Sequence, residues 1–362
     1  MRGLALMAVA VTVVVSPGAG RSQPAGAAQS EGRIAFTRTV DASREDRREL
    51  HVMNAGGSGI RKLTRGVSDD TDPVWAPDGR RIAFVSQRPR SQTVRRFNIY
   101  LVNPNGGAVR RLTDSRWSDS PVWSPDGSRI AFIRRFPHPP GNQVGSTTPE
   151  IFVMNADGSG ERRLTRNKLH ESSLGWSRTG KLAFARGPGL DNTFAQIFVM
   201  NPDGSGLQRL TRNRFYEAEV RWSPNGQQIA FVRASRTRLR SAVWVMNADG
   251  SGQRRLTAAF RADPDTVGLA WSPDGSRIAL NWGSLSRPGI YTMNADGSGL
   301  RRVTRMEAGL PTWSPDSRRL AFHRWPAIYV ANADGTGQRR LVPRPGARLS
   351  AGGENWSPVW SP

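Results

Sequence analysis

Seven acidic residues recur along this chain, each lying shortly before a tryptophan. They are Asp70, Asp119, Glu171, Glu217, Asp265, Glu307 and Glu354. Carboxylates that converge in a folded protein can hold a divalent ion such as calcium, or the amine of a peptide. The default alternative is that each acid caps the start of its own strand or pairs with a nearby arginine. We therefore expect an acidic ring, and a cation or an amine as the ligand to test there.

Arginines gather in the segments that follow a second repeated feature, the triplet Ile/Leu-Ala-Phe/Leu. Lysine and arginine total 52 against 29 aspartates and glutamates, which gives a formal net charge of +23. A basic rim could hold a polyanion such as a cell-wall polymer or a nucleic acid, and solvated loop charge is the alternative. The rim residues that we expect are Arg88, Arg90, Arg95, Arg96, Arg134, Arg135, Arg236, Arg238 and Arg240.

Metal-assisted chemistry would have to use Glu171, Glu217 and His170. With a metal held there, the chain would act as a lyase, a lactonase or a hydrolase. The histidines His138, His170 and His323 fit no known metal spacing, and the chain has no cysteine. The favoured interpretation is therefore a protein without catalytic residues or cofactors, and calcium at the acidic ring is the ion to test.

These residues must be positioned by a repeat. The stretch from Trp123 to Phe132 (WSPDGSRIAF) has relatives along the chain, and their tryptophans are 42 to 53 residues apart. The tryptophans stand at positions 75, 123, 176, 222, 271, 313 and 360. A period in the forties that is rich in β-formers and turn residues is typical of a propeller blade rather than a helical solenoid.

Each repeat encodes four strands. Pro125, Asp126 and Gly127 favour a tight turn between the first two, because proline presets φ, aspartate bonds its own backbone and glycine tolerates positive φ. A second string, residues 151–165 (IFVMNADGSGERRLT), contains the Asp-Gly signal of a hairpin between the third and fourth strands. The small alanine of each second strand should face the tryptophan of a neighbouring repeat. Basic residues in the fourth strands, paired in all but one of them, should protect the outer edge of the sheet.

The two ends of the chain complete one repeat between them. Residues 31–36 (EGRIAF) resume the pattern that residues 357–362 (SPVWSP) leave at a proline. A ring closed by pairing its own termini exposes no free sheet ends. The sequence therefore predicts an all-β, seven-bladed β-propeller that is closed by pairing of its N- and C-terminal strands.

Binding is expected at one end of this propeller. The connections from second to third strands, and from each fourth strand to the next first strand, should emerge on the same face. The former connections vary most in length and composition, and binding residues usually lie on variable loops over a fixed scaffold. We expect an acidic channel mouth inside a basic rim on this face.

The N-terminus has the features of an export signal. Met1 and Arg2 precede an apolar run from Leu4 to Val15, which is too short for a stable membrane anchor. We expect residues 1–28 to be a signal peptide and residues 29–362 to form one propeller domain.

The strings WSPDGSRIAF and IFVMNADG resemble the repeat of the TolB-type, WD-repeat-like β-propellers over about residues 31–362. The resemblance implies a periplasmic scaffold that contacts an envelope lipoprotein. We expect no counterpart of the family's N-terminal α/β domain in residues 29–362, and seven blades where TolB has six. Similar propellers occur in prolyl-oligopeptidase-like peptidases, but the Gly-x-Ser-x-Gly motif of their hydrolase domain does not appear in this sequence.

The favoured function is an exported, soluble, monomeric propeller in the periplasm or outside the cell, which binds a protein or cell-envelope component through its loop face. The alternative is a metal-dependent lyase, lactonase or hydrolase with its site at the channel mouth. Binding of a polyanion by charge is the third possibility.

Overall fold

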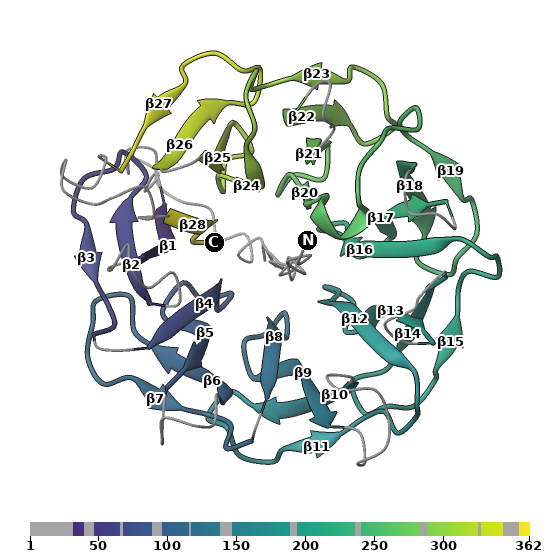
Figure 1. Cartoon of the computed structure of the whole chain (residues 1–362), viewed down its shortest axis with the longest axis horizontal. Helices are drawn as coiled ribbons and strands as arrows, with labels where there is room; N and C mark the ends of the chain where they lie inside the picture. Colours follow the sequence, from purple (N-terminus) through teal and green to yellow (C-terminus); the bar gives the residue numbers. More distant parts are fainter. Residues whose placement is uncertain are drawn as a thin grey trace, which may run out of the picture.

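The computed structural model describes residues 32–39, 47–65, 68–88, 96–115, 117–137, 147–188, 194–235, 240–282, 288–324, 327–342 and 355–362. Seven four-stranded sheets stand around a common axis (Figure 1). The expected all-β, seven-bladed propeller is thus confirmed. The expected signal peptide, residues 1–28, lies outside the described residues.

Within each blade, neighbouring strands are antiparallel, and the four strands follow one another from the axis outward. The innermost, first strands are β4 (Asp69–Trp75), β8 (Ser118–Trp123), β12 (His170–Trp176), β16 (Tyr216–Trp222), β20 (Leu269–Trp271), β24 (Gly309–Trp313) and β28 (Asn355–Trp360). The second strands are β1 (Arg33–Thr39), β5 (Ile82–Gln87), β9 (Arg129–Pro137), β13 (Leu182–Gly187), β17 (Gln228–Ala234), β21 (Arg277–Trp282) and β25 (Arg319–Arg324).

The third strands are β2 (Arg48–Asn54), β6 (Phe97–Val102), β10 (Thr147–Asn155), β14 (Gln196–Met200), β18 (Ser241–Asn247), β22 (Gly289–Asn294) and β26 (Ala327–Asn332). The outermost strands have two residues each: β3 (Arg61–Lys62), β7 (Arg110–Arg111), β11 (Arg162–Arg163), β15 (Gln208–Arg209), β19 (Arg254–Arg255), β23 (Arg301–Arg302) and β27 (Arg339–Arg340). A short 3₁₀ helix, η1 (Pro264–Thr266), precedes β20. Within the described residues, no helix combines the length and the apolar character that crossing a bilayer requires.

The ring is closed where the two ends of the chain meet. Strand β28 pairs with β1, and Trp360 lies opposite Ile34 in that pairing. The Ser361 backbone N–H donates to the Arg33 carbonyl over 2.6 Å, and the Arg33 N–H donates to the Ser361 hydroxyl over 2.8 Å. Ser124 and Arg129 make the same two bonds in an unbroken turn, so the closing blade keeps the geometry of the others.

The repeated tryptophans join neighbouring blades. Trp123 packs in one buried cluster with Ala83 of the preceding blade, and its Nε1 donates to the carbonyl of Val74 over 3.2 Å. The Arg81 guanidinium covers the indole, 4.9 Å from its centroid. The expected pairing of a small alanine with a large tryptophan is therefore seen here. Burial of the indole ring against the alanine and under the guanidinium stabilises the interface between the blades.

The basic residues of the fourth strands also contact the next blade. Arg61 donates to the carbonyl of Asn105 over 2.6 Å, and Arg110 donates to that of Asp157 over 2.7 Å. Arg254 and the carbonyl of Asp296 repeat the contact at 2.7 Å. These arginines therefore join neighbouring blades at the outer edge. This role is additional to the edge protection that the sequence predicted.

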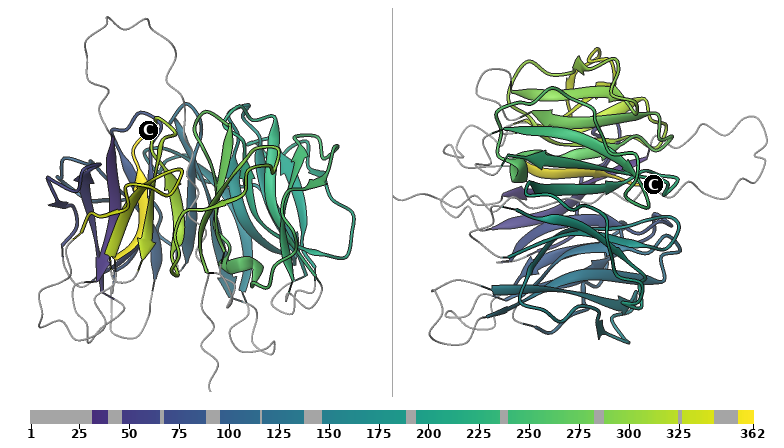
Figure 2. Two further views of the ribbon diagram at one scale, coloured as in Figure 1. Left: turned by 90° about the horizontal axis from the view of Figure 1, so that it is seen from above. Right: turned by 90° about the vertical axis from the view of Figure 1, so that its right-hand side faces the viewer.

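Antiparallel pairing gives the ring two different faces, which the side views in Figure 2 separate. We call turn face the end that carries the turns between first and second strands and between third and fourth strands. The opposite end carries the other connections, and we call it the loop face. Among the described residues, the acids expected at the channel mouth belong to the loop face.

Candidate functional site

We number the blades from the closing blade (β28, β1, β2 and β3) as blade one, so that β12 to β15 form blade four and β16 to β19 form blade five. Glu171 is the centre of a buried network at the loop-face end of blade four. It is fully buried, and Arg186 on the neighbouring strand β13 donates to its Oε1 from Nε and Nη2, over 3.0 and 2.6 Å. The Thr165 hydroxyl and the Ile151 backbone N–H donate to Oε2, over 2.6 and 3.1 Å. Burial raises the pKa of the Glu171 carboxyl, and these donors oppose the rise. Both carboxylate oxygens are thus held by residues of the protein itself.

Blade five repeats this network around Glu217. Arg233 donates to Oε1 from Nε and Nη2, over 2.9 and 2.7 Å, and Thr211 donates to Oε2. The cause lies in the register, because Glu217 is the strand partner of Arg233, just as Glu171 is the partner of Arg186.

Asp70 occupies the same position in blade two but has a shorter side chain. It is fully buried, lies opposite Ser86 in the register, and accepts a 2.5 Å hydrogen bond from the Ser86 hydroxyl. Burial raises the pKa of this carboxyl, while the Ser86 hydroxyl opposes the rise.

Asp119 is one residue closer to its tryptophan than Glu171 is to Trp176. In its blade, Ser118 holds the position that corresponds to Glu171 and lies opposite Arg134. Because side chains alternate along a strand, this shift moves the Asp119 carboxylate to the other side of the blade. There it pairs with Arg135 over 2.7 Å.

The remaining expected acids lie outside the first strands or outside the described residues. Asp265 lies in η1 and accepts a 2.9 Å hydrogen bond from the Tyr216 hydroxyl of the preceding blade. Glu307 is exposed in the loop before β24. Glu354 lies outside the described residues.

The three residues of the metal-dependent alternative do not share a site in the described structure. Glu171 and Glu217 are each held by an arginine of their own blade. Burial and the nearby Arg135 lower the pKa of His170 to about 4, although Asp119 opposes them. Among the described residues, no three His, Cys, Asp or Glu side chains form a group that could hold a metal ion. The side chains described here therefore do not fit a common metal.

The described arginines of the expected rim differ in their contacts. Arg134 makes a double contact with Glu161, at 2.5 and 2.7 Å, and Arg135 pairs with Asp119. Arg88 lies over the Tyr100 ring, 4.6 Å from its centroid. The other described members are Arg96, which is half-buried, and Arg240, which is exposed; Arg90, Arg95, Arg236 and Arg238 lie outside the described residues.

A set of inner-strand residues escaped the sequence interpretation. They stand three residues before a tryptophan, have φ values of 51° to 54°, and mark irregularities in the pairing of the first strands: Asp72, Ser120, Ser173, Glu219 and Leu310. Glu219 pairs with Arg221 at 2.7 Å, and burial raises the pKa of Asp72 to about 7, helped by the nearby Asp119. Their residue types differ from blade to blade, so the sequence carried no signal for this conformation.

The loop face also exposes apolar side chains that the sequence interpretation did not single out. Leu169, Phe194 and Phe215 are 39%, 39% and 44% exposed. Leu169 and Phe215 hold the same position in the strings TRNKLHE (165–171) and TRNRFYE (211–217), so the repetition of these strings was an available signal.

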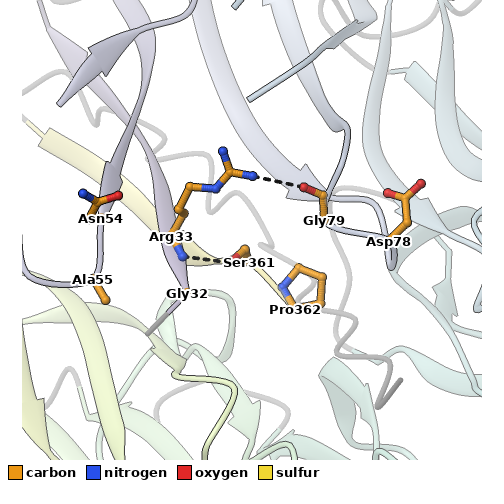
Figure 3. A pocket seen from close by; sticks show the side chains of 8 residues that line it. All are labelled: Gly32, Arg33, Asn54, Ala55, Asp78, Gly79, Ser361 and Pro362. Atoms are coloured by element: carbon orange, nitrogen blue, oxygen red, sulfur yellow. Dashed lines mark hydrogen bonds between the residues drawn. The ribbon is translucent and has the colours of Figure 1, made fainter. Parts of the chain in front are cut away.

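A cavity of about 580 Å³ lies on the opposite, turn face, at the seam between the chain ends. Figure 3 shows Arg33, Ser361 and Pro362 at its wall, with the Arg33 backbone N–H on the Ser361 hydroxyl and its guanidinium on the Gly79 carbonyl. The Arg33–Ser361 contact belongs to the ring closure, and the Arg33–Gly79 contact joins the closing blade to the next one. The cavity therefore belongs to the closure and not to the loop face.

Sequence comparisons agree with this architecture. Residues 33–138 match the family model described as the TolB beta propeller domain. A 65-residue stretch is 37% identical to the uncharacterized peptidase YuxL of Bacillus subtilis (strain 168), covering 18% of this chain and 9% of the relative. An 80-residue stretch is 32% identical to the Tol-Pal system protein TolB of Thioalkalivibrio sulfidiphilus (strain HL-EbGR7), covering 22% of this chain and 17% of the relative. The chain thus matches under a fifth of either curated relative.

Solved structures with similar folds include TolB from Acinetobacter baumannii, with a TM-score of 0.55 and 19% identity, covering 91% of this chain and 67% of that one. An oligogalacturonate lyase in complex with manganese has a TM-score of 0.62 and 14% identity, covering 79% and 82%. A puromycin-hydrolyzing peptidase of Mycobacterium tuberculosis has a TM-score of 0.63 and 13% identity, covering 94% and 57%. At these identities the likeness shows the propeller fold alone.

Proposed function

Because this chain is a TolB-like seven-bladed β-propeller, we propose that it serves as a binding scaffold for a protein or another component of the cell envelope. In this proposal the chain is exported to the periplasm or beyond, acts as a monomer, and binds through its loop face. One relative is a Tol-Pal system protein, which supports an envelope role for the proposal.

The observation that carries the proposal is the inward pairing of the loop-face acids. Glu171 and Glu217 are fully buried and each is bound by an arginine, a threonine and an asparagine of the protein. A buried ion pair of this kind holds its loop in one conformation, whereas a general acid or base must reach a substrate proton. The pattern supports a rigid binding surface better than a hydrolytic or lyase site.

The metal-dependent alternative would need these carboxylates to leave their arginines. Calcium at the channel mouth stays a prediction, which calorimetry with calcium chloride on the full chain checks. Heat of binding that disappears in the Glu217→Gln variant would favour the metal site. Heat in neither protein, at millimolar calcium, would favour the scaffold.

The scaffold proposal is tested by oriented capture. Since the chain has no cysteine, one introduced cysteine fixes its orientation on a thiol-reactive support. Leu207→Cys, at a turn-face site 49% exposed, leaves the loop face open, and Met306→Cys, at a loop-face site 54% exposed, turns the loop face to the support. We expect envelope proteins to bind the first surface and not the second. Equal capture by both, or by the second alone, would refute binding through the loop face.

A further inference from the structure

Two neighbouring loops of the loop face are built on the same plan. In the loop before β12, the Leu169 backbone N–H donates to the Asn167 side-chain oxygen over 2.7 Å, and Asn167 Nδ2 donates to Glu171 over 2.9 Å. The Asn167 backbone N–H donates to Glu150 over 2.8 Å. A side chain that bonds its own backbone two residues on defines a compact turn, so the loop is fixed from both sides.

The loop before β16 makes the same three contacts. The Phe215 N–H donates to Asn213 over 2.8 Å, Asn213 Nδ2 donates to Glu217 over 3.0 Å, and the Asn213 N–H donates to Gln196 over 2.8 Å. The buried glutamates therefore act as anchors for both loops.

With asparagine and glutamate turned inward, the other residues of each loop point to solvent. Arg166, Lys168 and Leu169 are exposed on the first loop, and Arg212, Arg214 and Phe215 are exposed on the second. Phe194 joins the second loop, because its neighbour Ala195 bridges to Tyr216 and accepts a 3.1 Å hydrogen bond from the Glu217 N–H. We call these seven residues the blade 4–5 patch.

The patch has a one-sided charge. None of its four cations forms a salt bridge with another residue in the part of the chain that the structure describes. The acids that anchor these loops, Glu171 in β12 and Glu217 in β16, are buried against Arg186 and Arg233. An incoming anionic group would therefore meet unpaired positive charge at the surface, which favours encounter with an acidic partner.

Resting on the proposed function, we infer that the blade 4–5 patch docks an acidic peptide segment of the partner that also carries aromatic or aliphatic side chains. Arginine beside aromatic side chains is the composition that dominates binding energy at protein interfaces. A polyanionic polymer would be served by the four cations alone, and it would gain little from the exposed Leu169. The mixture of cations with Leu169, Phe194 and Phe215 therefore fits a peptide better.

The test uses random 12-residue peptides displayed on phage and selected on the full-length protein. We expect enrichment of peptides that combine Asp or Glu with Phe, Leu or Trp. The synthesised winner should bind roughly tenfold or more weakly to Phe194→Ser/Phe215→Ser and to Arg212→Glu/Arg214→Glu, as measured by fluorescence anisotropy.

Matched variants on the turn face are the controls. Leu207→Ser/Leu300→Ser removes similar exposed apolar area, and Arg80→Glu/Arg178→Glu makes the same charge change. Both should bind like the unmodified protein. Equal weakening by the turn-face variants, failure to enrich any peptide, or sensitivity to the arginine variant alone with full competition by heparin would overturn the inference, and the last result would indicate a polyanion site.

Oriented capture separates this inference from the proposed function. If Leu207→Cys protein carrying Phe194→Ser/Phe215→Ser still captures the same envelope proteins, the patch is refuted and the scaffold stands. If Leu207→Cys protein captures nothing while the selected peptide depends on the patch, the patch stands and the envelope role fails.

Discussion

Arg186 directs two of its guanidinium nitrogens, Nε and Nη2, to a single carboxylate oxygen of Glu171, over 3.0 and 2.6 Å. The two residues are strand partners, and the side chain of Arg186 is only 9% exposed. The pair therefore lies inside blade four, where it fixes the loop above it and is withheld from solvent.

This pairing predicts a strong penalty for removing one partner. Glu171→Leu or Arg186→Met should each lower the free energy of unfolding by about 3 kcal/mol, because either change leaves a buried charge uncompensated. The double variant should be closer to the unmodified protein than either single one. Urea unfolding followed by tryptophan fluorescence measures the effect, with Glu307→Ala as an exposed control. Additive losses in the double variant would show that the residues do not interact.

The hydrogen bond between blades predicts a difference between two tryptophans. Trp123 and Trp176 are buried alike, but Nε1 of Trp176 has no hydrogen-bond partner among the described residues, whereas Nε1 of Trp123 donates to Val74. Trp123→Phe should therefore cost about 1 kcal/mol more than Trp176→Phe. Thermal unfolding of the two variants compares their stabilities directly. Equal losses of stability would show that the Trp123–Val74 hydrogen bond does not stabilise the protein.

A third prediction concerns pH. Burial lowers the pKa of His323 to about 4, below its ordinary value of 6.5. Between pH 6.5 and 4 the unfolded chain takes up a proton at this site and the folded chain does not, so stability is present above pH 6.5 and falls as the pH drops. The His323→Gln variant should lose less stability over this interval in urea titrations. A slope identical to that of the unmodified protein would contradict the prediction.

The closing blade can be trapped covalently. Ala35 and Val359 are paired across β1 and β28, and antiparallel partners lie within the Cα separation that a disulfide requires. Ala35→Cys/Val359→Cys should oxidise to one intramolecular disulfide, visible as faster migration on non-reducing gels. Ala35→Cys/Val122→Cys, which joins unpaired blades, should stay reduced. Equal oxidation of both pairs would count against the closed ring.

The repeat made most of the fold predictable from the sequence. The seven recurring tryptophans predicted the number of blades. The two ends of the chain, which begin at Gly32 and stop at Pro362, complement each other and so predicted the closure. The pairing of Ile34 with Trp360 confirms that closure. The hairpin at Pro125–Gly127 also forms as expected, because Ser124 and Arg129 exchange backbone and side-chain hydrogen bonds around it. These features depend on local residue types, which a single sequence displays.

The placement of the acids was less predictable, because it depends on register and side-chain length. Glu171 lies five residues before its tryptophan and is the strand partner of Arg186. Asp119 lies four residues before its tryptophan, so its side chain is on the other side of the blade and pairs with Arg135. The sequence interpretation named pairing with nearby arginines as the default, and Glu171, Glu217 and Asp119 are paired in this way. The exposed Phe194 and Phe215 come together only through the contact between Ala195 and Tyr216, which no periodicity reveals.

The central claim, that this propeller binds its partner through the loop face, is tested most directly by photo-crosslinking in the source cells. A benzophenone amino acid would replace Phe215 or Met306 on the loop face, and Leu207 or Leu300 on the turn face, all four being exposed. We predict crosslinks to an envelope protein from positions 215 and 306, with none from positions 207 and 300. Crosslinks from the turn face alone, or equally from both faces, would contradict the account.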